Sequence, residues 1–311
     1  MNGYKPEGSL ITTPKNYEYT SSKSELETAL EKQVILEAVA YMCDHDLNLH
    51  VNFPCGIKGI IPRNEAQLCP IGETAKDIAI LTRVGKTVCF KVIGFKEGPC
   101  GNKTAILSRK AAQKECMENY IDTLIPGDII PSKVTHLEKF GAFIDIGCGI
   151  IALLSIDSIS VSRISHPAER FCVGDTIFTV LKSIDENGRI FVTTKELFGS
   201  WEENASKFSE GQTVQGVVRS IESYGIFIEL MPNLSGLAEY KNDIEAGKCV
   251  AVYIKSIIPD KMKFKLILID KVALTLPRRE PEYFVDVKNK KHIDSWIYSP
   301  VSSKKIIETI F

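Results

Sequence analysis

Short runs of alternating apolar and polar residues recur along this chain. Examples lie at residues 173–181, 248–255 and 263–268, and Gly, Asn, Asp or Pro stand between such runs. Alternation with period two is typical of a strand that buries one face, and the intervening residues favour turns. The pattern therefore predicts a mostly β fold made of short strands.

Two of these runs have nearly the same sequence. Residues 134–147 are VTHLEKFGAFIDIG, and residues 218–230 are VRSIESYGIFIEL. Further strand-like runs follow each copy at matching places, so that each unit has about five. Repetition at a fixed period indicates an array of similar modules, and about five short strands per module predict a small closed or nearly closed barrel.

A third, blurred module precedes these two, because residues 85–95 and 103–110 match the last runs of the second module. Helical periodicity separates the modules, and it places four apolar residues on one face in 111–124 and again in 196–208. We expect a flexible leader over residues 1–25, a degenerate barrel over 27–110, a linker helix over 111–125, a barrel over 126–195, a linker helix over 196–210, a barrel over 211–276, and an extension over 277–311 with a short helix capped near Ser302.

The composition narrows the classes of function. A hydrophobic content of 44% excludes wholesale disorder, and a formal charge of −1 excludes a global field that attracts polyanions. Any affinity for nucleic acid must then come from local basic groups and from stacking. No run approaches the roughly 20 apolar residues that cross a bilayer, so we expect a cytoplasmic protein without membrane contact.

The nine cysteines are scattered, odd in number and form no CxxC pair. We therefore expect reduced thiols and no metal or other cofactor. The alternative, a metal site at Cys43, His45, His50 and Cys55, has a spacing that fits no zinc motif. No P-loop, nucleophile elbow or dinucleotide fingerprint occurs either, so we expect no catalysis.

An aromatic–glycine–any–aromatic motif recurs in the two clear modules. Phe140 and Phe143 would face opposite sides of an ideal strand, but a bulge at Gly141 would bring both rings to one surface. Tyr224 and Phe227 repeat the arrangement. The alternative is that each ring belongs to a core; the repetition favours an exposed platform on which unpaired bases stack.

Residues 126–197 resemble an S1-type RNA-binding domain, the OB-fold repeat of bacterial ribosomal protein S1. The resemblance lies in the opening run PGDIIPSKV, in FGAF at 140–143, and in DENGRIFVTTK at 185–195. Residues 211–268 resemble a second copy and residues 27–110 a degenerate one. The whole chain is thus similar to a short homologue of that protein, with tandem five-stranded OB-fold barrels joined by short helical linkers.

The resemblance implies that RNA lies across the exposed aromatics, near a histidine on the third strand and an Asp and an Arg at the last hairpin. In the second module the matching residues are Phe140, Phe143, Asp185 and Arg189, with Leu153 at the histidine position. In the third they are Tyr224, Phe227, Asp260 and Lys263, with Glu239 at that position. In the first, Leu47 and His50 replace the aromatics.

Basic residues beside this surface are further candidates. Lys133, Lys139, Arg163 and Arg170 would form a phosphate-facing rim. His166 would reach nucleic acid from its loop; the alternative is that it orders that loop. The expected function is non-catalytic binding of single-stranded RNA, as mRNA on the small ribosomal subunit. The alternatives are a protein-interaction array that docks to ribosomal or RNA-processing machinery, and a detached accessory of a nuclease or polymerase.

Overall fold

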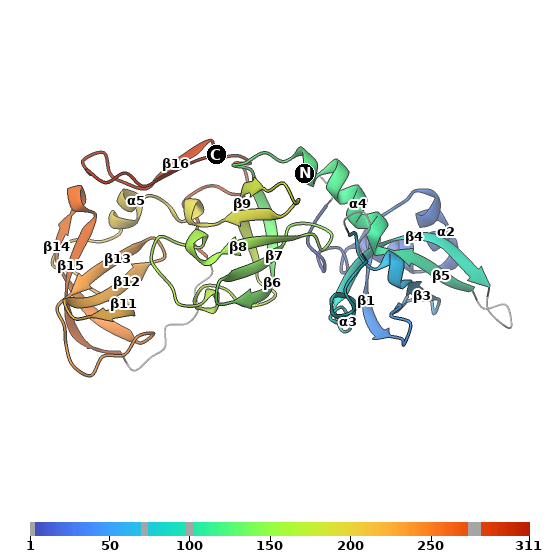
Figure 1. Ribbon diagram of the computed structural model, residues 1–311, viewed down its shortest axis with the longest axis horizontal. Coiled ribbons are helices and arrows are strands. Elements are labelled where there is room, and N and C mark those ends of the chain that lie inside the picture. Colours follow the sequence, from blue (N-terminus) through green and yellow to red (C-terminus); the bar gives the residue numbers. More distant parts are fainter. Residues whose placement is uncertain (1–3, 70–73, 98–102, 273–280) are drawn as a thin grey trace. The chain divides into compact units, whose positions relative to one another are not determined.

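Three closed five-stranded barrels make up most of this protein (Figure 1). A computed structural model describes residues 4–69, 74–97, 103–272 and 281–311. They divide into two compact units, one formed by residues 1–124 and 145–151 and the other by residues 125–144 and 152–311. The fold is mostly β, with tandem barrels of the OB type, as the alternation of short runs predicts.

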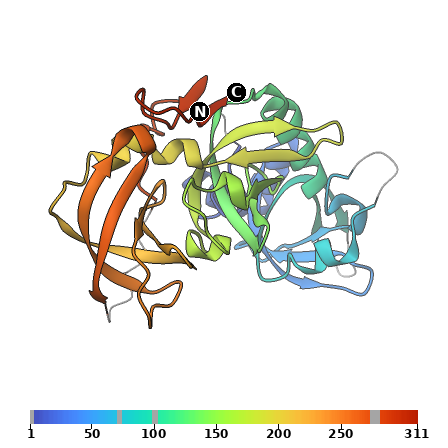
Figure 2. The same ribbon diagram turned by 60° about the vertical axis from the view of Figure 1, so that its left-hand side comes forward.

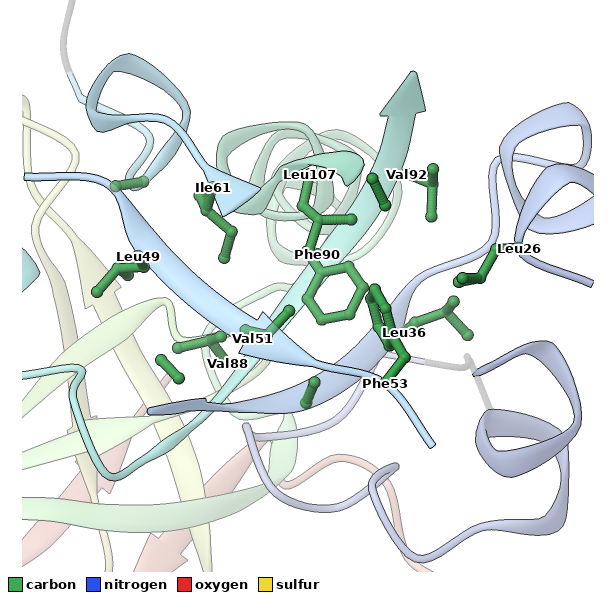
Figure 3. Packing of buried hydrophobic residues seen from close by; sticks show 14 of the residues in the cluster. Leu26, Leu36, Leu49, Val51, Phe53, Ile61, Val88, Phe90, Val92 and Leu107 are labelled. Carbon is green, nitrogen blue, oxygen red and sulfur yellow. The ribbon is translucent and has the colours of Figure 1, made fainter. Parts of the chain in front are cut away.

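Barrel 1 belongs to the first unit. Its strands are β1 (Leu36–Cys43), β2 (Leu49–Asn52), β3 (Lys58–Ile61), β4 (Thr87–Glu97) and β5 (Lys103–Ser108), closed in the order β1-β2-β3-β5-β4. Figure 3 shows Val51, Phe90 and Leu107 clustered inside it, and all three are fully buried. Along the chain, helix α3 (Asp77–Leu81) lies between β3 and β4, and helix α4 (Arg109–Asn119) follows β5.

The expectation of a flexible leader is wrong for residues 4–25, while residues 1–3 lie outside the described residues. Helices α1 (Pro14–Thr20) and α2 (Lys23–Glu31) form there. The buried Asn16 side chain donates to the Glu37 carbonyl at 3.0 Å and accepts from the Glu37 amide at 2.8 Å. These bonds satisfy the backbone of β1, a tertiary reason for order that the polar composition does not reveal.

Barrels 2 and 3 belong to the second unit and share one topology. Barrel 2 has β6 (Ile129–Glu138), β7 (Gly141–Asp145), β8 (Ile151–Ser155), β9 (Thr176–Ile184) and β10 (Ile190–Thr193). Barrel 3 has β11 (Thr213–Glu222), β12 (Gly225–Met231), β13 (Leu234–Ala238), β14 (Cys249–Ile258) and β15 (Lys263–Lys271). In every barrel the third and fifth strands pair in parallel, and Figure 2 shows the strands of barrel 3, in orange tones, curving around its core.

The linkers contain less helix than expected. In 111–125, α4 is followed by a 3₁₀ turn, and in 196–210 only α5 (Trp201–Ala205) is α-helical. Trp201 packs edge to face on Phe264 in the core of barrel 3, with ring centroids 5.7 Å apart. The 3₁₀ turns lie at Arg63–Glu65, Ile121–Thr123, Ile156–Ser158, Pro167–Glu169, Lys195–Phe198 and Pro259–Lys261.

The expected C-terminal helix near Ser302 is wrong, and residues 277–280 of that extension lie outside the described residues. Strands β16 (Ser295–Ile297) and β17 (Glu308–Ile310) form an antiparallel hairpin instead. Trp296 and Tyr298 alternate with exposed residues and join the core of barrel 3. The alternating burial of Trp296 and Tyr298 stabilises a strand. The lysine-rich sequence that follows them favours a helix when it is considered alone.

No helix within the described ranges is long and apolar enough to cross a bilayer.

Candidate nucleic-acid interface

The first aromatic pair lies on the outside of barrel 2. Phe140 is in the turn between β6 and β7 and is 56% exposed, while Phe143 is half-buried on β7. Their ring centroids are 6.0 Å apart, and the rings are perpendicular. Ala142 and Ile144, between and beside them, are fully buried. The strand thus gives its aliphatic residues to the core and its aromatic residue to the surface.

Barrel 3 carries a matching pair. Tyr224 is in the turn between β11 and β12 and is 67% exposed, and Phe227 is half-buried on β12. The centroids are 6.2 Å apart with an interplanar angle of 88°. The same edge-to-face geometry therefore occurs at the same place in two barrels.

The expected bulge at the glycine is wrong. Gly141 and Gly225 begin β7 and β12, so the preceding aromatics lie in turns, and this brings both rings of each pair to one side. A Cβ at Gly141 would lie 2.4 Å from the Leu154 carbonyl oxygen, and one at Gly225 would lie 2.6 Å from that of Ala238. Glycine is needed for this close approach of the next strand. The bulge lies instead on β11, between Val218 and Ser220.

Phe143 belongs to a row of four outward side chains across barrel 2. The outer row of barrel 2 consists of His136 on β6, Phe143 on β7, Leu153 on β8 and Phe191 on β10. The His136 and Phe143 rings stack with centroids 6.0 Å apart, and Leu153 lies directly opposite Phe191. His136 and Phe191 were missed from the sequence, although Phe191 alternates with buried Ile190 and Val192 and so had to face outward.

The outer row of barrel 3 consists of Ser220, Phe227, Leu237 and Lys265. Phe227 pairs with Ser220 on one side and with Leu237 on the other, and Leu237 pairs with Lys265. The third-strand position opposite Phe227 is therefore Leu237, and the assignment of Glu239 to it is wrong. Glu239 follows the end of β13 and is exposed.

The hairpins at the ends of these rows differ. In barrel 2, the Asp185 carboxylate accepts from the Asn187 amide at 2.9 Å and from the Arg189 amide at 2.8 Å. Asp185 therefore shapes the turn, and it leaves the exposed Arg189 side chain at its edge. Within the described residues no carboxylate forms an ion pair with Arg189.

Barrel 3 matches only half of that hairpin. Ile257 pairs with Phe264 as Ile184 pairs with Ile190, so Lys263 takes the place of Arg189. The place of Asp185 is taken by Ile258, which pairs with Lys263. Asp260 lies in the 3₁₀ turn beyond it and is exposed, so the structure does not give it the position of Asp185.

Two other candidates have different surroundings. Lys139 is exposed in the same turn as Phe140. His166 caps the 3₁₀ turn Pro167–Glu169, because its Nδ1 accepts from the Ala168 amide at 3.0 Å. No contact among the described residues joins His166 to the outer row of barrel 2, and the loop-ordering alternative explains its geometry.

Arg170, expected in a phosphate-facing rim, is in a buried ionic cluster between barrels 2 and 3. Its side chain is 8% exposed and its Nη2 lies 2.5 Å from Glu229. Glu229 also binds Arg219 at 2.8 and 3.0 Å, and Arg219 pairs with Glu169. Burial opposes the charge of Arg219, but the hydrogen bonds and charge of Glu229 raise its pKa above the ordinary value. The rim prediction is wrong for Arg170.

Barrel 1 lacks an aromatic pair. Leu47 and His50 occupy the two positions, as the sequence predicts, and Leu47 has a left-handed φ of +63°. His50 Nε2 lies 2.9 Å from Asp44, and this hydrogen bond holds the pKa of Asp44 below its ordinary value. The rest of its outer row is Met42, Ile60 and Ile106. No cluster of metal-ligating side chains occurs in the part of the chain that the structure describes.

Comparison with known proteins gives matches for the domain and for most of the chain. Residues 123–195 match the S1 RNA binding domain family. The chain is 29% identical over 287 residues to small ribosomal subunit protein bS1 of Staphylococcus epidermidis, a match that covers 86% of this chain and 67% of the relative. It is 30% identical over 237 residues to the bS1 of Staphylococcus aureus strain COL, covering 74% of this chain and 57% of the relative.

Among solved structures, the chain matches a multidomain protein with nucleic acid binding domains from Streptococcus pneumoniae. The match covers 80% of this chain and 77% of that protein. It is 14% identical with a TM-score of 0.24, which is too low to carry a structural argument.

Proposed function

We propose that this protein binds single-stranded RNA by stacking bases on the aromatic pairs of barrels 2 and 3, because residues 123–195 match the S1 RNA binding domain family. The observation that carries the proposal is the recurrence of an exposed edge-to-face pair, Phe140 with Phe143 and Tyr224 with Phe227. Base–aromatic stacking contributes about 1–3 kcal/mol per base and tolerates any sequence. It therefore suits a chain whose formal charge is only −1.

Basic side chains near the pairs complete the proposed sites. We assign phosphate contacts to Lys139 and Arg189 in barrel 2 and to Lys263 in barrel 3, all of which are exposed. Asp185 acts by shaping the hairpin that presents Arg189. His166 and Asp260 receive no RNA contact in this proposal, because one caps a turn and the other lies outside the matching register.

The relatives' names place them in the small ribosomal subunit. By analogy we propose that this protein holds mRNA near that subunit in the cytoplasm, with no catalytic step and no cofactor. The barrel domains of this proposal are residues 27–110, 126–195 and 211–276. The chain spans 57–67% of those relatives' lengths. The proposal about partners therefore concerns this chain and not the whole length of the relatives.

Barrel 1 favours a second role in protein contact. Its outer row has no aromatic pair, and Tyr41 and Met42 on β1 are each 42% exposed. An apolar surface without a stacking platform suits a protein partner better than RNA.

The test is a titration of fluorescent single-stranded RNA with wild type and the Phe140→Ala/Phe143→Ala variant, read by anisotropy. We expect affinity to fall by about 1–3 kcal/mol for each lost stack. Tyr17→Ala, which removes a 64% exposed aromatic ring from α1, is the matched control. Equal affinities of wild type and the double variant would contradict the stacking proposal.

A further inference from the structure

A cleft of about 430 Å³ is lined mainly by the loop that follows β8 in barrel 2. Its apolar walls include Ile156, Ile164 and Ile307, and its charged groups are Arg163, Lys195 and Asp157. The volume is within the range of small-ligand sites, which combine apolar walls with a few polar groups.

Two hydrogen bonds of the lining loop show where this cleft lies relative to barrels 2 and 3. The Ile156 amide donates to the Phe140 carbonyl at 2.9 Å, so one wall is bonded directly to the turn that carries the exposed ring. Further along the same loop, the Val161 amide donates to Asn233 Oδ1 at 2.9 Å. Asn233 lies in the β12–β13 turn and is fully buried. The cleft therefore extends from the first aromatic pair toward barrel 3.

Of the two cations of the cleft, Arg163 is open to a ligand, whereas Lys195 is shared with the buried Glu196. Lys195 Nζ is 4.0 Å from Glu196, but the Glu196 carboxylate already accepts from the Thr193 and Thr309 hydroxyls at 2.6 and 2.9 Å. Arg163 is exposed, and no ion pair to it occurs among the described residues. Asp157 is exposed and opposes Arg163, while the buried Glu196 pairs with Lys195, so the two cations are matched by two carboxylates. The exposed guanidinium of Arg163 is therefore the group of the cleft that attracts an anion.

We propose that this cleft binds the nucleotide adjacent to the base stacked on Phe140, with Arg163 and Lys195 contacting its phosphate and the isoleucine side chains contacting its base. The inference rests on the proposed function and adds to it a second subsite and a direction for the strand, from barrel 2 toward barrel 3. The aromatic pair supplies stacking, and the cleft adds phosphate contacts to those assigned to Lys139 and Arg189.

The experiment measures the dependence of RNA affinity on salt. For single strands, each phosphate contact contributes about 0.7 to the slope of log K against log salt. We expect Arg163→Gln/Lys195→Gln to reduce that slope by about 1.4 and to weaken binding roughly tenfold at low salt. Because Lys195 neighbours the buried Glu196, Arg163→Gln alone is the second variant, with about half the change in slope.

The control is Lys288→Gln/Lys290→Gln, which removes two exposed lysines from the segment before β16 and should leave the slope unchanged. If wild type binds RNA, Phe140→Ala/Phe143→Ala weakens binding, and the cleft variants keep the wild-type slope, the inference is wrong while the proposed function stands. If the Phe140→Ala/Phe143→Ala variant binds as wild type does, the proposed function itself fails.

Discussion

The outer rows of barrels 2 and 3 have the same centre and different ends. Both have at the centre one ring of an edge-to-face aromatic pair, Phe143 or Phe227, next to a third-strand leucine, Leu153 or Leu237. Barrel 2 adds two more rings, His136 and Phe191, where barrel 3 has Ser220 and Lys265. Under the proposed function, this difference would make barrel 2 bind RNA mainly by stacking and barrel 3 with a larger contribution from charge.

Barrel 1 extends the comparison. It has the same strand order around a buried core, yet its row is Met42, His50, Ile60 and Ile106. Inward residues therefore determine the barrel, whereas outward residues differ between barrels and, in our proposal, determine what each one binds. This separation follows from the period of two, since the two faces of a strand can change independently.

Removing both aromatic pairs should have the largest effect. We expect Phe140→Ala/Phe143→Ala combined with Tyr224→Ala/Phe227→Ala to reduce RNA affinity by about 4 kcal/mol or more, because several stacks are lost together. Of the two double variants, that in barrel 2 should cost more, since its pair lies in a row with two further rings, His136 and Phe191, and so belongs to the larger stacking surface. Anisotropy titrations of all three variants check this order, and a larger loss from the barrel 3 variant would reverse the comparison.

Three glycine-to-alanine substitutions should separate the cost of close steric approach from the cost of backbone strain, both measured as a loss of unfolding free energy. At Gly225 an added Cβ meets the Ala238 carbonyl and φ is +153°, so we expect Gly225→Ala to cost about 3 kcal/mol of unfolding free energy. Gly141→Ala, which meets the Leu154 carbonyl, should cost about 2 kcal/mol. Gly174→Ala has φ +98° and open space, and should cost about 1 kcal/mol. Urea unfolding measures all three, and equal costs would show that close approach does not matter.

Exchanging the ends of the rows should exchange their salt dependence. We expect Lys265→Phe to lower the salt slope of RNA binding by about 0.7 and Phe191→Lys to raise it by about 0.7. The two changes together should leave the slope near the wild-type value, with affinity altered by about 1 kcal/mol or less. Slopes that do not move would mean that neither row end contacts the RNA.

The sequence predicted the barrels and the aromatic pairs well, because both depend on local alternation and on a repeat. Predictions from the sequence were wrong mainly where contacts between residues far apart in the chain determine the local structure. Asn16 orders α1 by bonding to Glu37, far along the chain. The misplacement of Glu239 is different, because the offset of 84 residues between the copies that begin at 134 and 218 already leads from Leu153 to Leu237, the residue that pairs with Phe227. His136 lies beside Phe143 only once β6 and β7 are paired.

The smallest effect, a gain, should come from building an aromatic pair into barrel 1. Leu47→Phe/His50→Phe would place rings at the two matching positions, and Leu47 already has a positive φ, so the new ring adds little backbone strain. The gain is limited to about 1 kcal/mol, because His50→Phe removes the hydrogen bond to Asp44 and the row has no further rings. It is measured in the variant that lacks all four aromatic residues of barrels 2 and 3, where the background affinity is lowest. Restored binding would show that the outer row alone distinguishes the barrels, and unchanged binding would show that the barrel 1 surface lacks something besides rings.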